Sequence, residues 1–205
     1  MIKNFIFDMG SVLIDFNKES FLDKVGVFDV DDRKLLLNEI FNSLDWSLLD
    51  RGDIQEDDLY NRVIKVLPER LHSVAYKLIF NWDEPLVEIN GMNELISDLY
   101  NDGYDIYLLS NASKRLRNGY FYRLSFAKYF KQLVVSGEIG MLKPNEEIYQ
   151  YILRKYNLNP SECIFIDDLP INVEGAYRLG INGIVFHNDV KQLREKIKNI
   201  INKQA

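Results

Sequence analysis

Four short apolar segments of this chain are each followed by side chains that could do chemistry. In chain order these side chains are Asp8, Ser110-Asn111, Lys143 and Asp167-Asp168. An ionised carboxylate at the tip of a buried strand is costly unless a cation, hydrogen bonds or a substrate compensate it. Acids at two of these positions and a cation at a third are therefore candidates for one functional site.

The elements that must position these side chains are strands of an α/β fold. The apolar runs that precede them are Phe5-Ile6-Phe7, residues 104–109, residues 133–136 and residues 163–166. Between the first two runs the sequence predicts a helix that ends at Gly103. Its apolar residues at helical spacing are Met92, Leu95, Ile96 and Leu99. Open α/β sheets bind ligands outside the carboxyl ends of their strands. The sequence therefore predicts a Rossmann-like parallel sheet core flanked by helices, with the four endings at one edge.

A helical segment interrupts this alternation. From Asp15 to about Val87 the β-type runs vanish, and apolar residues recur at helical spacings such as Leu59, Val63 and Leu67. The sequence predicts an α/β core made of residues 1–14 and 88–205, with a helical cap of residues 15–87 inserted into it.

The four endings, in this order, resemble the motifs of the haloacid dehalogenase (HAD) superfamily. Most of its members are magnesium-dependent phosphatases that work through an aspartyl-phosphate. The resemblance covers Met1 to about His187, and the pattern from Asp8 to Asp15 is similar to the branch that includes sugar-phosphate phosphatases such as glucose-1-phosphate phosphatase. In that branch an α-helical cap inserted after the first motif closes over the active site and selects the substrate.

The resemblance implies a role for each motif residue. Asp8 would be the nucleophile, and Lys143 would bridge it to a phosphate oxygen. Mg²⁺ would be bound by Asp8, the backbone carbonyl of Gly10 and Asp168, with Asp167 as a second or water-mediated ligand. The other groups implied to bind the phosphate or substrate are Ser110, Asn111 and the backbone N–H groups of Met9 and Gly10.

One departure from the family pattern concerns proton transfer. Most family phosphatases carry a second Asp two residues after the nucleophile, and this chain has Gly10 there. Glycine can supply only its carbonyl to Mg²⁺ and has no side chain for proton transfer. Asp15 is the nearest acid that could take over proton transfer, although it could equally cap the helix that follows.

The predicted cap contains one weaker candidate. Residues 46–52, Trp-Ser-Leu-Leu-Asp-Arg-Gly, are predicted to form a loop between helices. Caps of the family place a specificity loop over the active site, so Arg51 is predicted to reach a distal anion or hydroxyl of the substrate. A surface arginine beside a turn glycine is an equally good interpretation.

Composition narrows the class of protein. The net charge is −6 and no basic stripe is apparent, which argues against a nucleic-acid partner. No apolar run approaches a membrane-spanning length, and the opening residues show no signal-peptide pattern. The lone cysteine, Cys163, excludes an intrachain disulfide. We expect a cytoplasmic monomer or homodimer that acts on a small phosphorylated metabolite, with no nucleic-acid or membrane partner.

Two other functions fit the same fold. A hydrolytic dehalogenase would use Asp8 as nucleophile on carbon without a metal, but those relatives lack the acidic pair Asp167-Asp168. A catalytically weak binding protein is suggested by Gly10. Retention of Asp8, Ser110, Lys143 and both late acids argues against that function, because polar groups that are costly to bury have no reason to stay together without one.

Overall fold

The computed structural model describes residues 1–84 and 86–204, and its core is a five-stranded sheet with the order β3-β2-β1-β4-β5. Every neighbouring pair of strands is parallel. The predicted α/β fold is thus confirmed, with a fifth strand, β5, that the apolar pattern had not indicated. The strands are β1 (Asn4–Phe7), β2 (Asp105–Ser110), β3 (Gln132–Val135), β4 (Cys163–Asp167) and β5 (Asn182–Val185).

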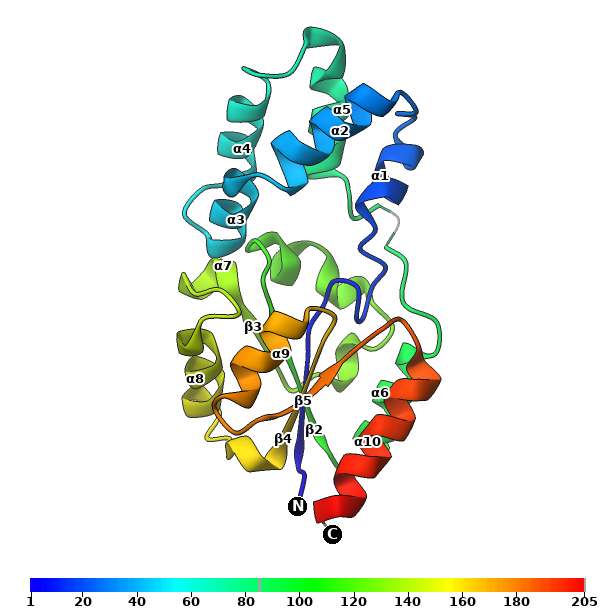
Figure 1. Cartoon of the computed structure of the whole chain (residues 1–205), viewed down its shortest axis with the longest axis vertical. Helices are drawn as coiled ribbons and strands as arrows, with labels where there is room; N and C mark the ends of the chain where they lie inside the picture. The colour runs from blue at the N-terminus through cyan, green and yellow to red at the C-terminus, as the bar shows by residue number, and fades with distance from the viewer. Residues whose placement is uncertain (85, 205) are drawn as a thin grey trace.

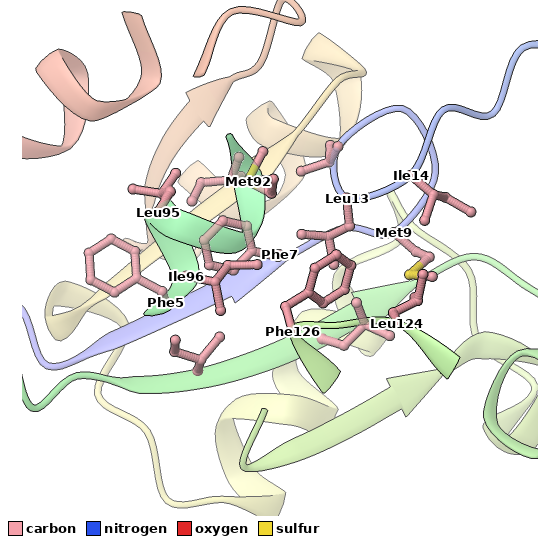
Figure 2. Close-up of a cluster of buried hydrophobic side chains, with 14 of the residues drawn as sticks. Phe5, Phe7, Met9, Leu13, Ile14, Met92, Leu95, Ile96, Leu124 and Phe126 are labelled. Atoms are coloured by element: carbon pink, nitrogen blue, oxygen red, sulfur yellow. The ribbon is translucent and has the colours of Figure 1, made fainter. Parts of the chain in front are cut away.

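Side chains of the strands alternate between two buried faces, which is why the strands are almost continuously apolar. Phe5 and Phe7 point into one hydrophobic cluster, and Ile6 between them points into another. Figure 2 shows the first cluster, where Phe5 and Phe7 lie beside Leu95 and Ile96. All of these side chains are at most 2% exposed, so the sheet is a rigid support for whatever its ends carry.

Helices cover both faces of the sheet (Figure 1). One face is covered by α6 (Met92–Asn101) and α10 (Val190–Gln204), and the other by α8 (Glu146–Lys155) and α9 (Pro170–Tyr177). Among the described residues, none of the helices combines the length and apolar character needed to cross a lipid bilayer.

Strand register brings the predicted site residues to one edge. Phe7 at the end of β1 is paired with Leu108 of β2 and Ile166 of β4. The Asp8 N–H then donates to the Ile166 carbonyl at 2.9 Å. The residues that follow β1, β2 and β4 therefore emerge side by side.

Residues after β1 form a separate helical lobe, drawn above the sheet in Figure 1. Its helices share a hydrophobic cluster of their own, built from residues between Phe16 and Trp82. The chain leaves and re-enters the core side by side, since the Asp15 N–H donates to the Val87 carbonyl at 2.8 Å. The helices of the lobe are α1 (Lys18–Lys24), α2 (Val30–Leu36), η1 (Leu37–Phe41), α3 (Leu44–Arg51), α4 (Glu56–Val63), η2 (Glu69–Leu71) and α5 (His72–Phe80).

The prediction of a loop at residues 46–52 was wrong, because residues 44–51 form helix α3. Ser43 caps its start by accepting the Trp46 N–H, and Gly52 ends it in the left-handed conformation, with φ of 84°. Buried Leu49 anchors the helix in the lobe's own cluster. Trp46 and Asp50, four residues apart, therefore lie on one face of a helix.

Helix α3 rests on the short helix α7 (Ser136–Ile139), which follows β3 (Figure 1). The Ser136 hydroxyl donates to the Asp50 carbonyl at 2.5 Å, and the Ser113 hydroxyl donates to the Glu56 carboxylate at 2.8 Å. A Cβ atom at Gly52 would overlap the backbone carbonyl of Gly137. The lobe is thus held against the carboxyl edge of the sheet by two hydrogen bonds and by a close backbone approach that requires glycine at position 52.

This contact predicts that Gly52→Ala is more damaging than Gly26→Ala. Both glycines have φ near 80°, where a Cβ costs roughly 1–2 kcal/mol, but nothing lies within 4 Å of a Cβ at Gly26. We expect Gly52→Ala to lower the free energy of unfolding by at least about 1 kcal/mol more than Gly26→Ala, because overpacking adds to the strain. Urea unfolding of both variants measures this, and equal losses would contradict the docking of α3 on α7.

Candidate active site

One buried lysine joins two carboxylates at the carboxyl edge of the sheet. Lys143 Nζ lies 2.8 Å from Asp8 Oδ1 and 2.6 Å from Asp167 Oδ2. The side chain of Lys143 is 1% exposed, that of Asp167 is fully buried, and that of Asp8 is 12% exposed. Asp8 is thus the member of this triad that keeps an opening toward solvent.

Asn111 fixes the backbone from which Lys143 projects. Its side-chain amide donates to the Lys143 carbonyl at 2.9 Å, and its side-chain oxygen accepts the Lys143 N–H, also at 2.9 Å. Asn111 was predicted to bind substrate, and it does line the cavity described below. The contacts show that its amide group connects the end of β2 to the loop that carries Lys143.

The two carboxylates at the end of β4, Asp167 and Asp168, have different surroundings. Asp167 accepts hydrogen bonds from the Leu169 N–H at 2.9 Å and from the Asn172 side-chain amide at 3.0 and 3.1 Å, in addition to its contact with Lys143. Asp168 instead lines the cavity. One carboxylate oxygen from each of Asp8, Asp167 and Asp168 lies within 4.8 Å of the other two, so the cluster could hold a metal ion.

The electrostatics of the triad raise the pKa of Asp8 in the metal-free protein. Burial raises the pKa of Asp8 to about 6, against the lowering effect of Lys143, and the charge of Asp167 adds to the rise. Burial likewise raises the pKa of Asp168, with a further rise from Asp167. The pKa of Lys143 is raised although burial lowers it, because Asp8 and Asp167 favour the charged amine. The site therefore holds more negative charge than one ammonium compensates.

The turn after β1 shapes the floor of the site. Met9, Gly10 and Ser110 line the cavity with Asp8, and the Met9 backbone forms a hydrogen bond with the Asp8 carboxylate. Ser11 adopts the left-handed conformation with φ of 56°, an uncommon conformation for a residue other than glycine, asparagine or aspartate. The chain thus bends sharply just beyond the candidate nucleophile.

A cavity of about 820 Å³ lies between this edge of the sheet and the helical lobe. Its floor carries Asp8, Lys143 and Asp168, and its lobe side carries Lys18 and Asp50. Aromatic side chains complete the lining on the lobe side and on the segment after β2; they are Phe16, Phe41, Trp46, Trp82 and Tyr120. The cavity is large enough for a small metabolite and closed on one side by the insert.

Two predicted site residues lie away from the triad. Asp15 is exposed at the entrance to the lobe, where it lines the cavity. Arg51 is exposed, forms an ion pair with Asp53, and is absent from the residues that line the cavity. The adjacent Asp50 lies in the cavity instead, because a helix turns neighbouring side chains by about 100° from one another.

Sequence reasoning missed three contributors. Asn172 had no predicted role, yet it donates to both oxygens of Asp167. Lys18 and Asp50 had no assigned role, although both line the cavity. A signal for Asp50 was present, since it stands four residues after Trp46 and directly after the apolar Leu49 at the end of a helix.

Comparisons with known proteins agree with this architecture. A family model described as haloacid dehalogenase-like hydrolase matches residues 2–180. D-ribitol-5-phosphate phosphatase of Bacteroides thetaiotaomicron is 24% identical over 190 residues, covering 88% of this chain and 89% of the relative. A crystal structure of a HAD family enzyme from the same organism, in complex with magnesium and inorganic phosphate, has a TM-score of 0.68 and 25% identity, covering 92% of this chain and 96% of that one.

Another relative is much longer than this chain. Drimenol cyclase drtB of Aspergillus calidoustus is 23% identical over 207 residues, which cover 100% of this chain but only 38% of the relative. The likeness therefore concerns one part of that protein.

The triad predicts that Lys143→Met destabilises the protein strongly at pH 8, by about 3–5 kcal/mol, because it leaves buried carboxylates without their cation. Lys131→Met is a matched control, since Lys131 pairs with Asp105 at 2.7 Å on the surface and such pairs contribute at most about 1 kcal/mol. Urea unfolding in the presence of a chelator gives both values. Similar small losses would show that Lys143 is not holding the carboxylates together.

The raised pKa of Asp8 predicts the opposite effect for Asp8→Asn in metal-free protein. Asn mimics the neutral carboxyl, and a pKa rise from 3.8 to about 6 corresponds to at most about 3 kcal/mol of lost stability once Asp8 is ionised. The gain from Asp8→Asn should be absent below pH 4, appear as the pH rises toward 6, and be complete above it. An Asp8→Asn variant that is less stable than wild type at pH 8 would overturn the electrostatic argument.

Proposed function

This chain belongs to the haloacid dehalogenase-like hydrolases and is a hydrolase of that type, and we propose that it is a Mg²⁺-dependent phosphatase of small phosphorylated metabolites such as sugar or polyol phosphates. The observation that carries this proposal is the arrangement of Asp8, Asp168 and the buried Lys143 around one end of a cavity. A phosphate monoester is a dianion, so a carboxylate can approach it only where positive charge neutralises the repulsion.

The residues present fit a magnesium ion. Three carboxylates face one ammonium, which leaves two negative charges when all are ionised, and Mg²⁺ carries two positive charges. Mg²⁺ prefers oxygen ligands, and Asp8 and Asp168 would hold it together with the Gly10 carbonyl. The oxygens of Asp167 are already engaged by Lys143, Leu169 and Asn172, so we assign it to holding Lys143. When bound, the metal would neutralise the phosphate and keep Asp8 ionised.

The side chains then divide the reaction between them. Asp8 attacks phosphorus to give an aspartyl-phosphate, and water cleaves that intermediate to release phosphate. Lys143 places its ammonium beside Asp8, where a phosphate oxygen gathers negative charge in the transition state. The Ser110 hydroxyl and the turn after Asp8 supply hydrogen-bond donors for the other phosphate oxygens.

The substrate class follows from the cavity and the relatives. A cavity of about 820 Å³ with Lys18 and Asp50 opposite the triad can hold a small organic group with hydroxyls. A D-ribitol-5-phosphate phosphatase among the relatives, and the likeness of the Asp8–Asp15 segment to sugar-phosphate phosphatases, support a polyol or sugar. The insert of residues 15–87 would act as the cap that selects this group.

This function predicts that hydrolysis of phosphate monoesters requires both Mg²⁺ and Asp8. Asp8→Asn should lower turnover at least about 10³-fold while the protein stays folded, because the nucleophile and a metal ligand are lost together. Phosphate release from a panel of sugar phosphates, nucleotides and phospho-acids, with Mg²⁺ or excess chelator, measures this. Full activity in chelator would contradict the metal and favour a dehalogenase; no turnover of any monoester with Mg²⁺ would contradict the phosphatase.

A further inference from the structure

Hydrolysis of an alkyl phosphate needs a proton that the floor of this site does not offer. When the bond between phosphorus and the ester oxygen breaks, the leaving alkoxide must be protonated. Position 10 has no side chain to do so, although its backbone is outside the left-handed region and a Cβ there would meet nothing closer than Phe16 at 3.4 Å. The glycine is therefore not required by backbone geometry, and another group must supply the proton.

Asp50 lines the cavity from the lobe, as do Glu19, which pairs with Arg33, and Glu56, which accepts the Ser113 hydroxyl. The Asp50 side chain lines the same cavity as Asp8 and Lys143 but comes from the last turn of α3. The organic part of a substrate whose phosphate lies at Asp8 must extend toward this side of the cavity. The ester oxygen connects those two parts, so it would lie between Asp8 and Asp50.

The surroundings of Asp50 favour the neutral carboxyl, the form that a proton donor needs. Burial raises the pKa of Asp50 well above its usual value, and the charge of Asp8 raises it further, against the lowering effects of Lys18 and Lys143. Tyr120 also lines this part of the cavity. The carboxyl end of a helix disfavours negative charge as well.

Hydrogen bonds to the core fix the backbone of Asp50. Its backbone carbonyl accepts the Ser136 hydroxyl at 2.5 Å, and the same Ser136 oxygen accepts the Ala112 N–H at 2.8 Å. Ala112 follows Ser110 at the end of β2, so Asp50 is connected by two hydrogen bonds to the loop beside the phosphate site. An acid on the lobe is thereby positioned relative to the triad, as catalysis requires.

We propose that Asp50 is the catalytic proton donor of this enzyme, in place of an acid at position 10. As Asp8 bonds to phosphorus and the ester bond breaks, the Asp50 carboxyl gives its proton to the leaving oxygen. Water then attacks phosphorus and releases phosphate and Asp8, and the Asp50 carboxylate regains a proton from the solvent, which restores both residues. This inference rests on the proposed phosphatase function.

The test compares two esters with different needs for a proton. The leaving group of D-ribitol 5-phosphate is an alkoxide, whereas the leaving group of 4-nitrophenyl phosphate is a stable phenolate. We expect Asp50→Asn to lower kcat for D-ribitol 5-phosphate roughly 10²–10⁴-fold, the usual contribution of general acid–base catalysis, and kcat for the aryl ester less than about threefold. Asp45→Asn, the same change at the other end of α3 where Asp45 pairs with Arg62, should affect neither ester.

Equal losses on both esters, or no loss on either, would overturn the assignment. A loss confined to the alkyl ester in Asp15→Asn but not in Asp50→Asn would overturn it in favour of Asp15. Wild-type enzyme that hydrolyses no monoester of the panel with Mg²⁺ would refute the phosphatase itself, which separates failure of the proposed function from failure of this inference.

Wild-type enzyme provides a second test that does not depend on a variant that folds. A donor must be protonated, so kcat for D-ribitol 5-phosphate should fall as the pH rises through the pKa of Asp50. The aryl ester needs no donor, so its kcat should not show this fall. Any pH dependence caused by titration of Asp8, Lys18, Lys143 or Tyr120 should be the same for both esters. Identical pH profiles for the two esters would overturn the proposal.

Discussion

The site depends on one buried ammonium shared by two carboxylates. Lys143 lies within 2.8 Å of Asp8 and Asp167, and burial makes each of these charges costly without the others. The register of the sheet offsets part of this cost, because β1 and β4 end side by side and hold both acids near one cation. Asn111 and Asn172 then fix the lysine's backbone and the Asp167 carboxylate, so only Asp8 and Asp168 remain for a metal and a substrate.

A second dependence links the lobe to the core. The end of α3 and the start of α4 contact the core through Asp50, Gly52 and Glu56, all near the carboxyl ends of β2 and β3. The same contacts that hold the lobe in place also put the Asp50 side chain into the cavity. Substrate selection and proton transfer would then be connected, because a substrate that displaces α3 also displaces the acid.

The sequence predicted the sheet and the motif residues because they depend on local signals. Apolar runs ending on Asp8, Ser110 and Asp167-Asp168 identify strand ends, and parallel strands bring such ends together. Strand β5 was missed because Asn182-Gly183-Ile184-Val185 is short, and glycine weakens a strand pattern. The sequence places Asp50 beside apolar residues, but its place in the cavity depends on segments far apart in the chain. The contact of Asn172 with Asp167 spans only five residues and depends on the turn from β4 into α9, which the sequence pattern does not define.

The central claim is that Asp8 attacks phosphorus with Lys143 and a metal beside it. Acid quenching during turnover, followed by borohydride reduction and peptide mass spectrometry, tests this most directly, because an aspartyl-phosphate is reduced to homoserine. We predict homoserine at position 8, formed only when both Mg²⁺ and a phosphate monoester are present. Active enzyme that never yields homoserine at position 8, or yields it at another aspartate, would contradict the account.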